Sequence, residues 1–353
     1  MYSLGWQRNE VTELLKIPYP IFQAPMAGGI TTPGLISETS NCGGLGNLGA
    51  GYMNPEEIKE AIKQIKTLTD KPFGVNLFIP NMSEANSDEK DLTEMKKTLS
   101  KYEKELGIDE PIISSVKNYK ILYEHQIEEV LSGKVPVVSF TFGIPDKEVL
   151  TELKKQGSII IGTATNVKEA LELEESGVDI IVAQGSEAGG HRGTFHEEES
   201  GLIGSMALIP QVADAIHTPV VAAGGIMDAR GIAAAIALGA KGVQLGTAFL
   251  TCRESGAADI YKQTLLNSSE EETAFTKAFS GKLARGINNR FIKEMAHQPT
   301  MPFPVQNDLT TAIRKKASMQ KKPDFMSLWA GQGIRMAKET TVKQLMRELI
   351  EGR

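Results

Sequence analysis

Residues 178–193 read Val-Asp-Ile-Ile-Val-Ala-Gln-Gly-Ser-Glu-Ala-Gly-Gly-His-Arg-Gly, an apolar run that leads directly into a glycine-rich segment with one histidine. The run of residues 178–183, apolar except for Asp179, is typical of a strand that is covered on both faces, as in a parallel sheet. The glycines that follow let a backbone approach a ligand closely. The unperturbed pKa of a histidine lies near neutrality, so His191 suits proton transfer. This stretch predicts an acid–base site at the end of a buried strand, with an inert surface loop as the alternative.

The same strand pattern recurs along the chain and alternates with helical patterns. Residues 55–68 carry apolar residues at helical spacing, preceded by Asn54 as a capping residue and beginning with Pro55. Eight strands with intervening helices predict an α/β fold, a (β/α)8 TIM barrel, with a doubly wound open sheet as the rival topology. The strands are expected at residues 20–24, 44–48, 73–78, 135–140, 158–162, 178–183, 219–223 and 242–246, and further helices at 146–156, 166–176, 205–216 and 228–238.

Two stretches break this alternation and predict a second unit. We expect the barrel to comprise residues 1–79 and 134–270, and a smaller, mainly helical domain to comprise residues 80–133 and 271–353. The second domain is expected to pack over the barrel mouth as a helical insertion and a C-terminal cap region. Its helices are expected at residues 88–106, 310–317 and 342–351.

The bulk composition excludes several classes of protein. A net charge of −6 and a pI near 5.6 argue against a nucleic-acid-binding protein. The two cysteines, Cys42 and Cys252, form no metal-spaced cluster, so we expect no bound metal. Residues 1–16 lack the apolar core of a secretory signal, and the apolar segment 231–240 is too short to span a bilayer. We therefore expect a cytoplasmic enzyme without membrane contact.

Residues 44–49, Gly-Leu-Gly-Asn-Leu-Gly, match the GxGxxG dinucleotide-binding pattern. That pattern carries meaning only after a strand and at the start of a helix. Here a helical segment, residues 33–40, precedes it, and the next helix begins only near Pro55. A glycine-rich strand that lets a ligand approach its carboxyl end is therefore the favoured interpretation.

The last two predicted strands end in small residues suited to a phosphate. Loops after the seventh and eighth strands of such barrels often bind phosphate through exposed backbone N–H groups at helix N-termini. Residues 222–226 read Ala-Ala-Gly-Gly-Ile and residues 244–247 read Gln-Leu-Gly-Thr. Thr247 adds a hydroxyl donor. Two structural turns without a ligand are the alternative.

Other strand ends offer polar groups that could contact a flat ligand. Asn76 and Gln184 are amides at the ends of apolar strands, where they need a hydrogen-bond partner. That partner is either the edge of a ligand ring or a backbone group. Residues 24–28, Ala-Pro-Met-Ala-Gly, end the first strand at a proline, which opens backbone groups to a heterocycle or simply makes a turn.

Together these segments resemble nitronate monooxygenases, formerly called 2-nitropropane dioxygenases, which are FMN-dependent (β/α)8 enzymes. The resemblance covers most of the chain, and the run from Gly185 to Gly193 is its most specific part. The matching segments are residues 23–28, 74–76, 184–193, 222–228, 244–247, 276–282, 284–286 and 329–332.

The resemblance implies a cofactor, a reaction and roles for residues. FMN would be the cofactor. The substrates would be alkyl nitronates, such as propionate 3-nitronate, and O2, and the products a carbonyl compound and nitrite. The biological role would be detoxification. A homodimer is one expectation for the assembly. His191 would be the catalytic base. Residues expected to bind FMN are Ala24, Pro25, Met26, Asn76, Gln184, Gly189, Gly190, Gly224, Gly225, Gln244, Leu245, Gly246 and Thr247.

The chain also departs from some relatives, which place a second histidine after the fourth strand. Here Phe140 and Phe142 occupy that region and would make the wall apolar. His196 is interpreted as a solvated loop histidine. Lys282 and Arg285 would either attract an anion or serve as interdomain charges. Alternative functions are an FMN-dependent enoyl-[acyl-carrier-protein] reductase, an NADH:quinone reductase and a flavin-binding barrel without turnover.

Overall fold

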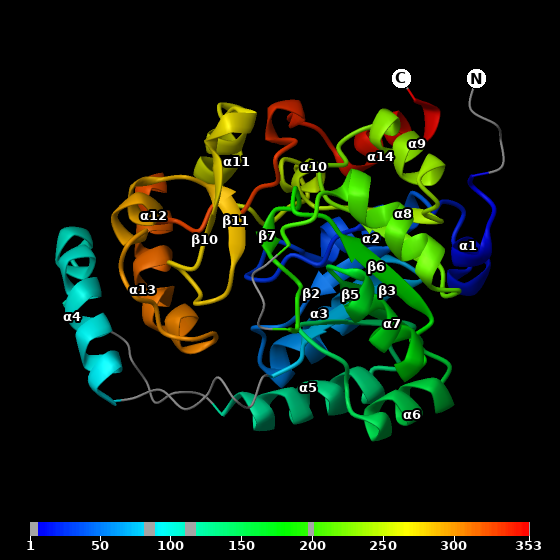
Figure 1. Cartoon of the computed structure of the whole chain (residues 1–353), viewed down its shortest axis with the longest axis horizontal. Coiled ribbons are helices and arrows are strands. Elements are labelled where there is room, and N and C mark those ends of the chain that lie inside the picture. The colour runs from blue at the N-terminus through cyan, green and yellow to red at the C-terminus, as the bar shows by residue number, and fades with distance from the viewer. Residues whose placement is uncertain (1–5, 81–88, 110–117, 197–200, 353) are drawn as a thin grey trace.

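The computed structural model describes residues 6–80, 89–109, 118–196 and 201–352, and eight parallel strands form its centre (Figure 1). The strand order is β1-β9-β8-β6-β5-β4-β3-β2. The sheet closes on itself where Leu45 bridges to Phe22, and this closure confirms the TIM barrel over the open sheet. The strands are β1 (Ile21–Gln23), β2 (Gly46–Gly49), β3 (Phe73–Phe78), β4 (Val137–Thr141), β5 (Ile159–Ala164), β6 (Ile180–Gln184), β8 (Val220–Ala223) and β9 (Gly242–Leu245).

Two buried amides strengthen the closure between β1 and β2. The Gln23 side-chain oxygen accepts the backbone N–H of Asn47 at 3.0 Å. The Asn47 amide donates in return to the backbone oxygens of Gln23 at 2.7 Å and Leu45 at 3.2 Å. These bonds satisfy polar groups that the barrel interior would otherwise leave unpaired. The sequence analysis did not single out this pair.

The glycines of strand β2 allow neighbouring backbone segments to pack closely against the strand. A Cβ at Gly46 would lie 2.1 Å from the backbone oxygen of Ile36, and a Cβ at Gly49 would lie 2.5 Å from the backbone nitrogen of Ala27. Any side chain there would displace helix α2 (Pro33–Asn41) or the turn after β1. The GxGxxG match is thus no dinucleotide loop, and backbone of the chain itself approaches these glycines. The approach of a ligand to the carboxyl end of this strand stays a prediction.

Helices surround the barrel and begin where the sequence placed capping residues. Asn54 and Glu57 form a reciprocal capping box at the start of α3 (Pro55–Leu68). Gly177 and Gly239, each with positive φ, follow the ends of α7 and α9. The apolar inner faces of α3 and its neighbours bury a continuous core against the strands. The other helices of the ring are α5 (Tyr119–Ser132), α6 (Lys147–Lys155), α7 (Val167–Ser176), α8 (Ser205–Ala215), α9 (Ala229–Ala237) and α14 (Val342–Glu351).

The amino ends of the strands are plugged by the first helix. Val11 and Leu15 of α1 (Glu10–Leu15) join a buried cluster with side chains from inside the barrel, among them Phe22 and Val182. This cluster closes the bottom of the barrel. Ligand access is therefore restricted to the carboxyl ends of the strands, where the active sites of TIM barrels lie.

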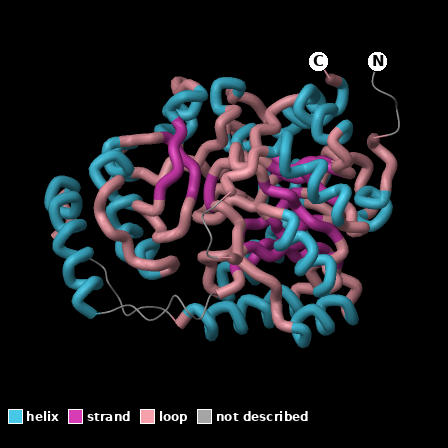
Figure 2. Tube along the Cα trace, in the orientation of Figure 1, coloured by secondary structure: helices cyan, strands magenta, loops and turns pink. Residues whose placement is uncertain are grey.

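A cap region lies beside the barrel and combines helices with a small sheet (Figures 1 and 2). Helix α4 (Glu89–Leu106) packs against α13 (Val305–Met319), and both contribute to a separate apolar core. The antiparallel sheet has the order β10-β11-β7 and is an addition to the expected helices. Its strands are β10 (Thr273–Thr276), β11 (Ala284–Ile287) and β7 (Gly190–His191), and the remaining helices here are α11 (Asp259–Leu266) and α12 (Arg290–Met295).

Two helices within the residue ranges predicted for the second domain pack against helices of the barrel. Helix α5 lies against α3 and contributes Tyr123, Ile127 and Val130 to the core around the barrel. Helix α14 lies against α2 and α9. Their apolar faces therefore complete the helical ring, while the domain division at residues 80, 133 and 271 stays a prediction.

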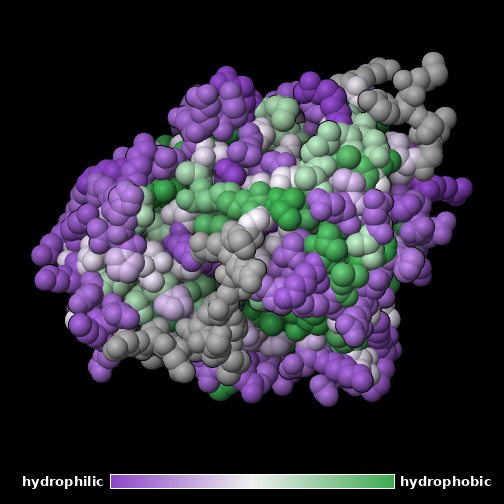
Figure 3. Space-filling view, in the orientation of Figure 1, coloured by the Kyte–Doolittle hydropathy of each residue, from purple (hydrophilic) through white to green (hydrophobic). Residues whose placement is uncertain are grey.

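The surface separates polar and apolar regions. On the face shown in Figure 3, hydrophilic side chains cover the outer side of α4, whereas hydrophobic residues gather between the cap region and the barrel. Within the described residues no helix is both long and apolar enough to cross a membrane.

Candidate active site

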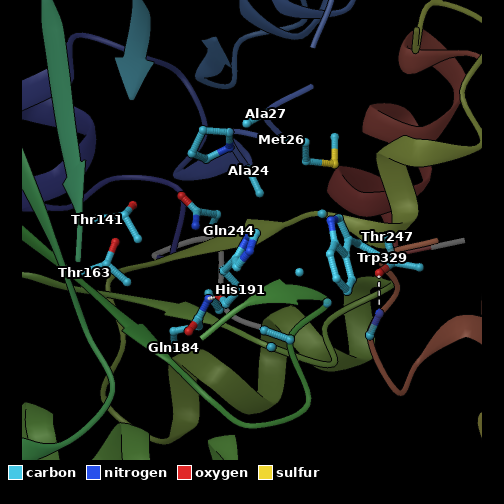
Figure 4. Close-up of a pocket in the computed structure, with 18 of the residues that line it drawn as sticks. Ala24, Met26, Ala27, Thr141, Thr163, Gln184, His191, Gln244, Thr247 and Trp329 are labelled. Atoms are coloured by element: carbon cyan, nitrogen blue, oxygen red, sulfur yellow. Dashed lines mark hydrogen bonds between the residues drawn. The ribbon is translucent and has the colours of Figure 1, made fainter. Parts of the chain in front are cut away.

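One cavity lies at the carboxyl ends of the barrel strands and collects nearly all the residues predicted from the sequence (Figure 4). Leu245 is the exception, because neighbouring residues of a strand point to opposite faces. Its side chain lies in the apolar core outside the barrel. Predicted residues that line the cavity are Ala24, Pro25, Met26, Asn76, Gln184, Gly189, Gly190, His191, Gly224, Gly225, Gln244, Gly246 and Thr247.

His191 sits on the short strand β7, where its backbone pairs with Ala284 of the cap region. The sequence predicted an acid–base site after the buried strand 178–183, but no strand at His191 itself. Its Nε2 atom lies 2.8 Å from the Ser280 hydroxyl. Burial, together with the positive charges of Lys282 and Arg314, lowers the pKa of the imidazole from 6.5 to about 3. The ring is therefore uncharged at neutral pH and can accept a proton.

Gln184 fixes the segment that carries His191. Its amide nitrogen donates to the His191 backbone oxygen at 3.0 Å, and its amide oxygen accepts the Gly193 N–H at 2.8 Å. The buried Arg192 side chain donates to the backbone oxygens of Gln184 and Thr165. Of the two partners expected for Gln184, the structure shows backbone, while a flavin contact by this residue stays a prediction.

Asn76 is oriented differently and keeps an acceptor for a ligand. Its amide nitrogen donates to the hydroxyls of Ser139 at 3.0 Å and Thr141 at 3.1 Å. Its amide oxygen accepts no hydrogen bond from any part of the chain described, although the residue lines the cavity. This carbonyl oxygen is therefore suited to accept an N–H from a heterocycle.

The opposite end of the cavity is suited to an anion. Gly224 and Gly225 both have positive φ, and Thr247 begins the short helix α10 (Thr247–Leu250). The Thr247 oxygen accepts the Gly331 N–H at 2.9 Å, so its own proton can be donated to a ligand.

The neighbouring helix α8 offers no such end, because a carboxylate already occupies its N-terminus. Glu187 accepts the N–H of Ser205 at 2.8 Å and the Ser205 hydroxyl at 2.9 Å. A phosphate would be repelled by this negative charge. An anion site at the Gly224 turn and the Thr247 segment, as the sequence predicted, stays a prediction.

Aromatic rings form the wall on the side of strands β2 to β4. The Phe142 ring centroid lies 4.7 Å from that of Phe78 and 5.9 Å from that of His191. Phe142 has a φ of 75°, a left-handed backbone that costs a bulky residue about 1–2 kcal/mol. This conformation turns its ring into the cavity. Phe140, which was expected in the same wall, is instead fully buried in the outer core.

The structure shows the positions of three side chains, Lys282, Arg285 and His196, whose roles the sequence left undecided. The Lys282 ammonium lies 4.8 Å from the Phe142 ring centroid, beside the cavity. Arg285 donates to the backbone oxygen of Ser186 and stacks on a cap-region ring, so it is a structural charge. His196 is bonded to Glu172 at 3.0 Å outside the cavity.

The site contains further residues that the sequence analysis did not assign. Figure 4 shows His191 with Thr141 and Thr163 on one side and Trp329 on the other. Ser280 and Trp329 lie far from His191 in sequence, and only their place in the matching segments 276–282 and 329–332 gave a signal. No group of three potential metal ligands occurs within the described residues.

Comparison with known proteins decides the family. Residues 8–352 match the family model described as nitronate monooxygenase. The chain belongs to the nitronate monooxygenase family. It is 44% identical over 349 residues to a probable nitronate monooxygenase of Staphylococcus aureus (strain Newman), covering 98% of this chain and 97% of that protein. This nitronate monooxygenase family member is accordingly an enzyme, an oxidoreductase built on a TIM barrel.

Solved structures agree with this assignment. Nitroalkane oxidase from Streptomyces ansochromogenes superimposes with a TM-score of 0.90 at 38% identity, covering 97% of each chain. FabK from Thermotoga maritima gives a TM-score of 0.76 at 30% identity, covering 98% of this chain and 95% of that chain. Both the higher TM-score and the higher identity favour the nitroalkane oxidase as the better guide to the site.

Proposed function

We propose that the protein is an FMN-dependent nitronate monooxygenase that oxidises small alkyl nitronates with O2 to a carbonyl compound and nitrite. The observation that supports this most is that an uncharged His191, an open amide acceptor on Asn76 and an anion-binding end at Thr247 line one cavity. Nitronate monooxygenases are flavoenzymes, and these features are the complement of a flavin that carries a phosphate.

The residues present fit FMN. Asn76 would accept a hydrogen bond from the ring, and the backbone of Gly189, which lines the cavity, would lie close to it. The Gly225 turn and the Thr247 hydroxyl would hold the phosphate. When bound, the flavin supplies the electron-accepting chemistry between substrate and O2, and the protein supplies placement and polarity.

The chain's own residues would select and orient the substrate. His191 would contact the nitro group or the adjacent carbon, and the aromatic wall of Phe78 and Phe142 would exclude water around a short alkyl chain. The positive charge of Lys282, which already acts on His191, favours an anionic ligand at this position. Propionate 3-nitronate is the proposed physiological substrate, because its nitronate and carboxylate are both negative, and detoxification is the proposed role.

Substrate turnover tests this function. We expect the purified protein to consume O2 and release nitrite with ethyl nitronate and propionate 3-nitronate, and to leave NADH unoxidised. Rapid NADH oxidation with inert nitronates would favour one of the two reductases instead. A cytoplasmic location and a homodimer are also proposed, and cell fractionation and light scattering test them.

A further inference from the structure

The cap region holds His191 by both its backbone and its side chain. Strand β11 pairs Ala284 with His191, and the Arg192 N–H donates to the Leu283 backbone oxygen at 2.8 Å. Four residues before Ala284, the Ser280 hydroxyl meets Nε2 of the imidazole at 2.8 Å. A single short segment therefore fixes both where the imidazole sits and how its plane is turned.

The Ser280 hydroxyl is itself held in a rigid turn. Ser280 is only 2% exposed, and its oxygen lies 3.1 Å from the Lys282 backbone oxygen and 3.3 Å from the Lys282 N–H. Gly281 has a φ of 81°, and a Cβ there would lie 2.2 Å from the backbone oxygen of Met301. The turn cannot shift without displacing the chain around Met301.

This geometry points to the imidazole nitrogen that carries the proton. The Ser280 hydroxyl has one proton, with the Lys282 backbone oxygen at 3.1 Å and His191 Nε2 at 2.8 Å within reach. A carbonyl oxygen can only accept, whereas an imidazole nitrogen can also donate, so we assign the Ser280 proton to the Lys282 oxygen. The Ser280 oxygen then accepts from His191, which places a proton on Nε2. The uncharged ring therefore has its lone pair on Nδ1.

Nδ1 is the nitrogen that is available to a ligand. It makes no hydrogen bond to any residue in the described ranges. It is also not one of the fully buried side-chain atoms without a hydrogen-bond partner, which belong to Ser37, Tyr52, Tyr102 and Tyr123, so Nδ1 is not shut off from the cavity. His191 lines the cavity, so Nδ1 is reached from the cavity side.

We propose that Ser280 is a positioning residue that keeps His191 in the Nε2–H tautomer, so that Nδ1 removes the α-proton of a neutral nitroalkane. This inference rests on the proposed function and extends its substrates from nitronates to nitroalkanes. The Cα–H bond breaks, its electron pair delocalises onto the nitro group to form the nitronate, and the proton moves to Nδ1. The imidazolium then donates from Nε2 to Ser280 and from Nδ1 to the nitronate.

Proton transfer to His191 creates an imidazolium, whose positive charge is compensated by the nitronate anion that forms in the same step. Burial, together with the positive charges of Lys282 and Arg314, opposes a positive imidazole and lowers the pKa of His191. The nitronate formed beside Nδ1 compensates the new positive charge. A nitronate substrate is already anionic and needs no proton removed, so its turnover depends less on the tautomer of His191.

A pair of serine variants tests the proposal by activity. Ser280→Ala should lower kcat/KM for nitroethane about 100-fold, while kcat/KM for ethyl nitronate changes by less than about threefold. Ser280→Thr, which restores a hydroxyl, should recover most of the loss. Ser158→Ala is the matched control, because it also removes a buried hydroxyl that donates to a backbone oxygen, 2.7 Å away at Val135, outside the cavity. An equal loss on both substrates would overturn the proposal.

Histidine-selective ¹⁵N NMR tests the tautomer without turnover. The chain has five histidines, so the His191 signals are identified by their absence in His191→Asn. We expect a protonated Nε2 and a bare Nδ1 in the native protein, and a mixture of tautomers in Ser280→Ala. A proton on Nδ1 in the native protein would overturn the proposal. Failure of the native protein to oxidise any nitronate would instead overturn the proposed function, whatever the NMR result.

Discussion

The barrel and the cap region contribute different things to the one cavity. The barrel supplies the groups suited to a cofactor, such as Asn76 and Thr247, each at the end of its own strand. The cap region supplies Ser280 and Trp329, which contact the His191 imidazole. The difference teaches that cofactor binding follows from the barrel topology, whereas the state of His191 depends on a distant segment folded against it.

The largest effect is expected from removing the imidazole on which the two regions meet. His191→Asn should lower kcat/KM for nitroethane by about 10²–10⁴-fold, because a general base contributes that much. Flavin content should stay unchanged, since the cofactor groups belong to the barrel. Initial rates of O2 uptake measure the first quantity and visible absorbance the second. Loss of the flavin along with activity would show that the two contributions are not separable.

The aromatic wall of the cavity is expected to set the preference for the chain length of the substrate. Phe142→Ala should raise kcat/KM for hexyl nitronate relative to ethyl nitronate about tenfold, because removal of the ring opens room for a longer chain. A series of nitronates of increasing length measures this ratio. Phe140→Ala is the control, since that ring lies outside the barrel and should leave chain-length preference unchanged. The assignment of the wall fails if both variants shift the preference alike.

Much of this division was predictable from the sequence, and the reasons are physical. Strand ends such as Gly224 and Thr247 carry local signals, because the glycines and the capping hydroxyl act within one βα unit. Phe140 was misassigned, because the left-handed backbone at Phe142 breaks the alternation by which residues two apart share a face. The side chain of Leu245 faces the outer core, and a contact of its backbone with FMN stays a prediction. Ser280 had no local signal at all, because its role arises from contact with a residue 89 positions away.

The anion-binding end of the barrel can be weakened alone. Thr247→Val should raise the dissociation constant of FMN about tenfold, the effect of losing a hydrogen bond worth about 1.4 kcal/mol. Fluorescence titration of the flavin-free protein measures it. Thr251→Val, at the other end of the same short helix, loses only a bond to the Lys338 backbone and should bind FMN as the native protein does. Equal affinity in both variants would remove Thr247 from the cofactor site.

The last effect concerns stability, which is expected to depend on pH. The pKa of His191 is about 3 when folded and 6.5 ordinarily, so the unfolded chain binds a proton first as pH falls. His191 therefore stabilises the native state less and less as the pH drops from 6.5 toward 3. In thermal melting of the flavin-free protein, the Tm of His191→Gln should rise relative to the Tm of the native protein as the pH is lowered from 7 to 4. A constant difference between their Tm values would mean that the imidazole is not held uncharged.

The central claim is that the barrel cavity binds one FMN next to His191. The most direct test is the absorbance of the purified protein together with identification of the cofactor released on denaturation. The account predicts a yellow protein that releases about one equivalent of FMN per chain and regains it on reconstitution. A colourless protein that fails to take up added FMN would contradict the account.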